Sequence, residues 1–164
     1  MPLPYVFIRE RLRLSWRTAL WGYEHKVIDW SGIVDLATDR CSEGSNDALE
    51  IELAGLTKIN AYHVDEVLTK LAASSAQSDD DVKQTWLYLL LAWLFEKQSE
   101  VVDPLGQVEI LYASFDYPVV MESFVRYMPA TDRDASSAHS IASEHSLLAN
   151  WQRYLDACAS RFKT

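Results

Sequence analysis

Residues 78–97, SDDDVKQTWLYLLLAWLFEK, contain the longest apolar run of the chain. Ser78 stands three residues before Asp81, which is the spacing of a capping box at the start of a helix. The aspartates that follow Ser78 fall in the first turn, where the helix dipole favours negative charge. Residues 86–95 are apolar on all sides, as in a helix buried at the centre of a bundle. We therefore expect a central apolar helix over residues 82–97.

Apolar residues recur at helical spacing through most of the remaining chain. The five glycines and five prolines also favour long regular elements over a turn-rich β fold. We predict an all-α protein, a single-domain bundle of residues 1–164 with about seven helices around the central helix. The polar residues 130–139 are expected to form a mobile loop. The N-terminal YVFI, residues 5–8, leaves a choice between short strand, extended arm and helix.

The chain is acidic, with a formal net charge of −9. The acidity belongs to residues 31–127, where six basic and seventeen acidic groups give a net charge of −11. Nucleic acid is therefore not expected as a direct partner, because a binder neutralises phosphates with lysine and arginine. Two interpretations remain, a surface that keeps the protein soluble and a surface that attracts a basic partner.

No motif of a known reaction occurs in the sequence. The histidines lack metal-ligand spacing, and neither a nucleophile elbow nor a phosphate-binding glycine loop is present. Cys41 and Cys158 are not spaced as a metal or redox motif and suit a reducing cytosol. The N-terminus does not read as a secretory signal, and the run of residues 86–95 is too short to span a bilayer. We expect a cytoplasmic protein that is not an enzyme, with no catalytic, cofactor-binding or metal-binding residues and no membrane contact.

Residues 109–129, EILYASFDYPVVMESFVRYMP, predict a helix, a tight turn and a second helix. Proline disfavours helix at the preceding residue, so the turn falls before Pro118, and Pro129 ends the second helix. Asp116 is expected to cap that second helix. Tyr117 is either a core residue or an anchor at an interface, where tyrosine is enriched.

The same stretch, together with residues 14–40, 50–56 and 85–94, resembles a small family of helical bacterial proteins of unknown function. The pattern W-x-x-x-L-x-G is matched by Trp16, Leu20 and Gly22. The pattern Y-A-x-F-D-Y-P…Y-M-P is matched by Tyr112, Ala113, Phe115, Asp116, Tyr117, Pro118, Tyr127, Met128 and Pro129. Small acidic bacterial proteins of this kind resemble the immunity proteins of contact-dependent growth inhibition and other polymorphic toxin systems.

This resemblance implies an immunity protein that binds and neutralises a cognate toxin in the cytosol. The expected partner is the C-terminal toxin domain of a large secreted or surface effector, with a basic nuclease as the best match for the charge. The protein itself is expected to be a monomer or weak dimer. A helical adaptor or scaffold is the first alternative, and a carboxylate-dependent hydrolase is the second. The expected partner-binding residues are Asp35, Asp39, Asp79, Asp80, Asp81, Asp116 and Tyr117.

Overall fold

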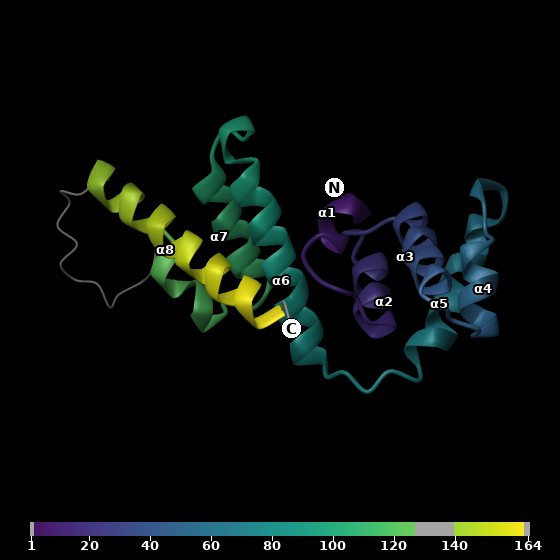
Figure 1. The fold of residues 1–164 in the computed structure, drawn as a ribbon. Coiled ribbons are helices and arrows are strands. Elements are labelled where there is room, and N and C mark those ends of the chain that lie inside the picture. Colours follow the sequence, from purple (N-terminus) through teal and green to yellow (C-terminus); the bar gives the residue numbers. More distant parts are fainter. Residues whose placement is uncertain (1, 127–139, 163–164) are drawn as a thin grey trace. The chain divides into compact units, whose positions relative to one another are not determined.

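The computed structural model describes residues 2–126 and 140–162, and every regular element in these two ranges is a helix (Figure 1). The all-α class is therefore confirmed. The α-helices are α1 (Tyr5–Arg9), α2 (Trp16–Glu24), α3 (Trp30–Ser42), α4 (Ala48–Ala54), α5 (Val64–Ala72), α6 (Asp79–Glu96), α7 (Pro104–Ser114) and α8 (Ser140–Phe162). The 3-10 helices are η1 (Lys58–His63), η2 (Gln98–Glu100) and η3 (Val119–Phe124).

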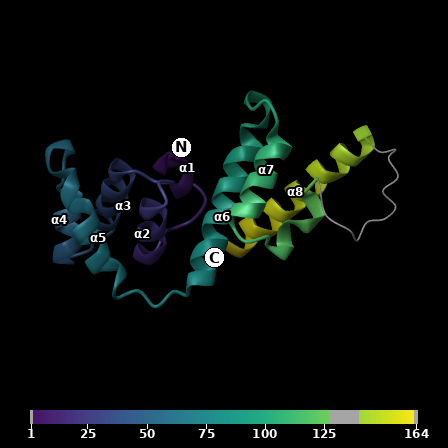
Figure 2. The same ribbon diagram turned by 180° about the vertical axis from the view of Figure 1, so that it is seen from behind.

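The chain forms two compact units, Met1–Trp86 and Leu87–Thr164. In the first unit α2 packs against α5, and α3 packs against α4 (Figures 1 and 2). The apolar helix predicted over residues 82–97 is α6, which supplies residues to both units. The organisation as one domain stays a prediction. The loop predicted over residues 130–139 lies outside the described residues.

The N-terminal YVFI segment is helical and forms most of α1, so the interpretations as a strand or an extended arm are wrong. Pro4 precedes the first turn in extended conformation, and Phe7 and Ile8 are buried on the inner side. The hydroxyl of Tyr5 donates to the carboxylate of Asp39 in α3 at 2.7 Å. Five residues make a marginal helix by themselves, so burial and this hydrogen bond stabilise α1.

Side chains cap the starts of several helices, including the start predicted at Ser78. Ser15 accepts from the backbone N–H of Thr18 at 3.1 Å at the start of α2, and Ser78 accepts from the N–H of Asp81 at 3.1 Å at the start of α6. These bonds satisfy backbone donors that have no partner within the helix.

The first eight residues of α6 pack within the first unit through Trp86. The indole is fully buried, and its N–H donates to the backbone carbonyl of Thr18 in α2 at 2.7 Å. Gly22, one turn further along α2, lies against the same ring. Close approach of α2 to α6 therefore depends on the absence of a side chain at Gly22.

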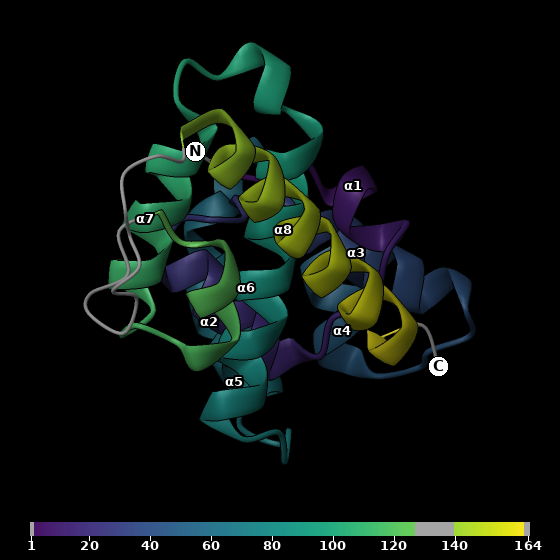
Figure 3. The same ribbon diagram turned by 90° about the vertical axis from the view of Figure 1, so that its left-hand side faces the viewer.

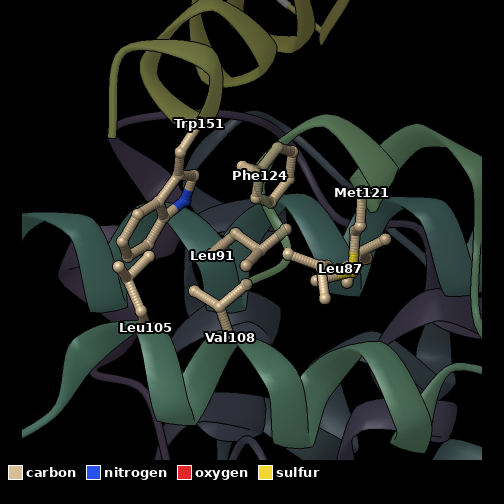
Figure 4. Packing of buried hydrophobic residues seen from close by; sticks show 8 residues of the cluster. Leu87, Leu91, Leu105, Val108, Met121, Phe124 and Trp151 are labelled. Atoms are coloured by element: carbon tan, nitrogen blue, oxygen red, sulfur yellow. The ribbon is translucent and has the colours of Figure 1, made fainter. Parts of the chain in front are cut away.

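The core of the second unit joins α6, α7, η3 and α8. Its buried apolar residues are Leu87, Leu91, Leu105, Val108, Met121, Phe124, Val125 and Trp151. The side chains labelled in Figure 4 point toward one another. Trp151 of α8 meets the ring of Phe95 edge-on with centroids 4.9 Å apart. This packing holds α8 across α6 (Figure 3).

The second helix predicted after Pro118 is the 3-10 helix η3, with Pro118 at its N-cap. Met128 and Pro129, which were expected to complete and end this helix, lie outside the described residues, as does Tyr127. Arg126 follows η3 and donates to Glu109 at 2.7 Å and to Asp103 at 3.1 Å. These bonds tie the end of η3 to the start and middle of α7.

Candidate partner-binding surface

A groove in the first unit is the candidate partner-binding surface, and we call it the α2–α5 groove. It has a volume of about 320 Å³. Its walls come from α2, the end of α5 and the start of α6. It is lined by Arg17, Leu20, Trp21, Glu24, Thr69, Ala72, Ala73, Asp79 and Val82.

Apolar side chains occupy the floor of the α2–α5 groove. Trp21 is half-buried, and its ring stacks on the imidazole of His25 with centroids 3.7 Å apart. On its other side the ring lies 6.5 Å, centroid to centroid, from buried Trp86. Trp21 is thus held by two rings and still reaches the surface. A large aromatic side chain that is fixed in this way loses little entropy on binding, which suits an interface anchor.

Charged side chains form the rim of the α2–α5 groove. Asp79 forms an ion pair with Arg17 across the groove, and Glu24 lies exposed on α2. Asp80 and Asp81 continue the first turn of α6 and are both exposed. Asp80 accepts a hydrogen bond from the side-chain amide of Gln84 at 2.8 Å. The rim therefore carries more negative than positive charge.

The two aspartates predicted on α3 lie apart from the residues that line the groove. Asp39 accepts hydrogen bonds from Tyr5 at 2.7 Å and from Arg9 at 3.3 Å, so it anchors α1 on α3. Asp35 is exposed, and partial burial together with the charges of Asp39 and Asp29 raises the pKa of its carboxyl. The structure thus gives Asp39 a role within the fold, while Asp35 remains on an acidic face.

Asp116 and Tyr117 lie in the second unit, where they end α7. Their φ angles are 61° and 57°, both in the left-handed region. The N–H of Tyr117 donates to the carbonyl of Tyr112 at 2.8 Å, and the N–H of Asp116 donates to that of Ala113 at 3.2 Å. This is the Schellman pattern of helix ends, completed by an edge-on contact of the Tyr112 and Tyr117 rings at 5.2 Å. Asp116 therefore ends the first helix, and the prediction that it caps the second helix is wrong.

Tyr117 also projects into solvent, with 62% of its surface exposed. It is followed by Val119 and Val120, which are exposed as well. The prediction that Tyr117 belongs to an exposed surface is therefore compatible with its position, although the residue also packs on Tyr112.

Among the predicted partner-binding residues, only Asp79 lines the α2–α5 groove. The sequence interpretation missed Trp21, Glu24 and Ala73. The buried residues of α2 are Trp16, Thr18, Ala19 and Gly22, and Trp21 lies beside them. A tryptophan next to the buried face of an amphipathic helix is the signal that was available.

The described residues contain no group of three or more histidine, cysteine, aspartate or glutamate side chains placed to hold a metal ion. Within the same ranges, no helix combines the length and the apolar character that a membrane span needs. A second depression of the first unit contains two carboxylates, Glu43 and Glu50, each beside an arginine.

Comparison with models of protein families gives a match over residues 5–158, to a family described as "Uncharacterized protein conserved in bacteria (DUF2247)". Neither a curated protein nor a solved structure matches the chain.

Proposed function

We propose that the chain, which belongs to the family of uncharacterized bacterial proteins DUF2247, is an immunity protein. It binds a cognate toxin domain in the cytosol and neutralises it by stoichiometric binding. The observation that carries the proposal is the α2–α5 groove, with Trp21 in its floor and Asp79 and Glu24 on its rim.

The groove has the chemistry of a protein interface. Leu20, Trp21 and Val82 offer an apolar surface that an inserted side chain can cover, while the charged rim selects the partner. Binding energy in such interfaces is concentrated in a few anchored aromatic and arginine contacts surrounded by polar residues. A basic side chain of the partner would pair with the exposed carboxylate of Glu24 on the rim, while an apolar side chain covers Trp21.

The charge of the chain supports a basic partner. The net charge of −9 speeds the encounter with a positively charged protein, and rim carboxylates fix the orientation of the complex. Toxin nucleases bind phosphates through basic surfaces. An acidic inhibitor that occupies such a surface places carboxylates where substrate phosphates would lie and so excludes the substrate.

The proposal is tested by co-purification with the product of the gene immediately upstream, with and without a block in the groove. Ala73 is exposed and lines the groove, so Ala73→Arg adds bulk and positive charge without filling a buried site. We expect the wild-type chain to retain the upstream protein and the Ala73→Arg variant to lose it. Ala159→Arg on α8 is the control, because Ala159 is also an exposed alanine.

Loss of the upstream protein by both variants, or by neither, would contradict the assignment of the groove. If the groove instead captures a bacterial protein that has no toxic activity, the protein is an adaptor rather than an immunity protein. Growth of cells that express the upstream gene with and without this chain separates these two functions.

A further inference from the structure

A second depression of the first unit lies where α3 ends and α4 begins, and we call it the α3–α4 depression. It has a volume of about 570 Å³ and is lined by Arg13, Arg40, Glu43, Gly44, Ser45 and Glu50. None of these side chains is apolar. Its volume falls in the range of small-molecule sites, but its lining differs from the mainly apolar lining of most such sites.

The end of α3 shapes the depression through Gly44. Its φ of 103° is one that side chains rarely allow. The N–H of Ser45 donates to the carbonyl of Arg40 at 3.1 Å, and the N–H of Gly44 donates to that of Cys41 at 3.0 Å. This Schellman end turns the chain sharply, so that Ser45 faces Glu50 of α4.

Glu50 is a buried carboxylate in the wall of the depression, with 8% of its surface exposed. The indole N–H of Trp16 donates to its Oε2 at 2.6 Å, and the hydroxyl of Ser45 donates to its Oε1. Nη1 of Arg40 lies 3.8 Å from Oε2. Each carboxylate oxygen accepts more than one hydrogen bond, so acceptor capacity remains for a ligand.

Arg40 is held beside Glu50, and its hydrogen bonds are incomplete. Its side chain is 16% exposed, it donates to the carbonyl of Leu14, and its guanidinium lies 5.2 Å from the centre of the Trp16 ring. Its Nε is buried without a hydrogen-bond partner among the described residues. An unmet donor on a buried charged group is costly.

Arg13 and Glu43 form the outer pair of the depression. Nη2 of Arg13 lies 2.7 Å from Oε1 of Glu43, and these side chains are 63% and 50% exposed. The depression therefore holds two guanidinium groups and two carboxylates, with one pair buried and the other at the mouth.

This balance of charge decides the kind of ligand. Two guanidinium groups repel a metal ion, two carboxylates repel a phosphate, and a polar lining gives an apolar ligand nothing to cover. We propose that the α3–α4 depression binds a small zwitterion with an ammonium and a carboxylate group, as in a free α-amino acid. Its carboxylate lies against Arg13 and Arg40, and its ammonium group lies against Glu43 and Glu50. The site is separate from the α2–α5 groove and does not depend on the proposed immunity function.

The test is a calorimetric titration of the full chain with each of the free protein-forming α-amino acids. Acetate and methylamine, which each carry one of the two charges, are titrated alongside. We expect saturable binding of at least one amino acid at concentrations up to about 10 mM, a range that detects weak metabolite sites. Neither acetate nor methylamine should bind, because each leaves one pair of charges without a partner.

Variants at the mouth of the depression make the test specific. Arg13→Gln and Glu43→Gln change exposed side chains, so folding should be retained, and each should weaken binding at least tenfold. Arg153→Gln and Glu52→Gln are matched controls at exposed positions outside the depression. Absence of binding by every amino acid to the folded chain would overturn the proposal and leave the two ion pairs a purely structural role. Equal binding by the mouth variants and the controls would also overturn it.

Discussion

A β-carbon added to Gly22 in α2 would lie 2.2 Å from the ring of Trp86 in α6, well inside any real contact distance. The ring cannot move away easily, because it is fully buried and its N–H bonds to Thr18. Gly22→Ala should therefore lower the free energy of unfolding by about 1–3 kcal/mol through overpacking. Gly55→Ala is the control, since its added carbon would meet only backbone oxygens at 3.7 Å. Urea unfolding of both variants measures the difference, and equal stability would refute the close packing of α2 on α6.

Three helices end in the Schellman pattern within the described residues, and their left-handed residues are Lys26 after α2, Gly44 after α3 and Asp116 after α7. A β-carbon in this conformation costs about 1 kcal/mol relative to glycine. We expect Asp116→Gly to keep or raise the free energy of unfolding. The free energy of unfolding of Asp116→Ala should be about 1 kcal/mol lower than that of Asp116→Gly. Asp116→Asn should stay close to wild type, because asparagine tolerates this conformation too. Thermal unfolding monitored by circular dichroism ranks the three variants, and an alanine variant as stable as the glycine variant would contradict the assignment.

The bond between Tyr5 and Asp39 gives the first unit a response to alkaline pH. Burial, and then the hydrogen bond to Asp39, raise the pKa of the Tyr5 phenol. A phenol with a higher pKa in the folded chain stabilises the fold fully below its unfolded pKa of about 10, and this contribution is lost as the pH rises from there through the folded pKa.

Tyr5→Phe should therefore cost about 1 kcal/mol at neutral pH through the lost hydrogen bond. It should also reduce the fall of stability above pH 10, because one titrating group has been removed. Denaturant unfolding at a series of pH values measures both effects. Tyr62→Phe serves as the control, because Tyr62 is 76% exposed. A Tyr5→Phe variant with the wild-type slope above pH 10 would show that neither burial nor Asp39 raises the pKa of this tyrosine.

Two buried tryptophans differ in what their indole N–H groups meet. Trp16 donates to the buried carboxylate of Glu50 at 2.6 Å, whereas Nε1 of Trp151 has no hydrogen-bond partner among the described residues. Replacing tryptophan by phenylalanine removes part of an indole ring at both sites. Only Trp16→Phe also removes a hydrogen-bond donor from a buried carboxylate, that of Glu50. We expect Trp16→Phe to cost about 1–3 kcal/mol more than Trp151→Phe. The unfolding free energies of both variants, taken from chemical denaturation, decide the point, and equal losses would remove Glu50 from the stabilising network.

The helices can be predicted from the sequence because the interactions that begin and end a helix join residues close together in the chain. Ser78 caps α6 as predicted, since a capping bond joins residues three apart. The end of α7 also depends on residues close together in the chain, but its left-handed position has aspartate where glycine is usual. Asp116 was therefore assigned to the following helix instead of the preceding one.

The α2–α5 groove was harder to predict because the residues that line it are distant from one another in the sequence. Trp21, Ala73 and Asp79 come together only after α2 has packed against α5 and α6, and no spacing rule relates them. Asp39, in contrast, was predicted to bind a partner but is bound within the fold. Its charge suggested a partner, but the hydroxyl of Tyr5, distant in sequence, binds it within the fold. That net acidity attracts a basic partner stays a prediction, and only the tertiary structure separates free carboxylates from bound ones.

The central claim is that the α2–α5 groove and its acidic rim bind a basic toxin domain. The most direct measurement is a calorimetric titration of the upstream gene product with the wild-type chain and with the double variant Asp80→Asn, Asp81→Asn. Asp156→Asn with Glu144→Gln on α8 removes the same charge from exposed positions and is the control. We predict submicromolar binding by wild type and control, and about tenfold weaker binding by the rim variant, since each interfacial charge contributes about 0.5–1 kcal/mol. No binding by the folded wild-type chain at micromolar concentrations, or equal affinity of the rim variant and the control, would contradict the claim.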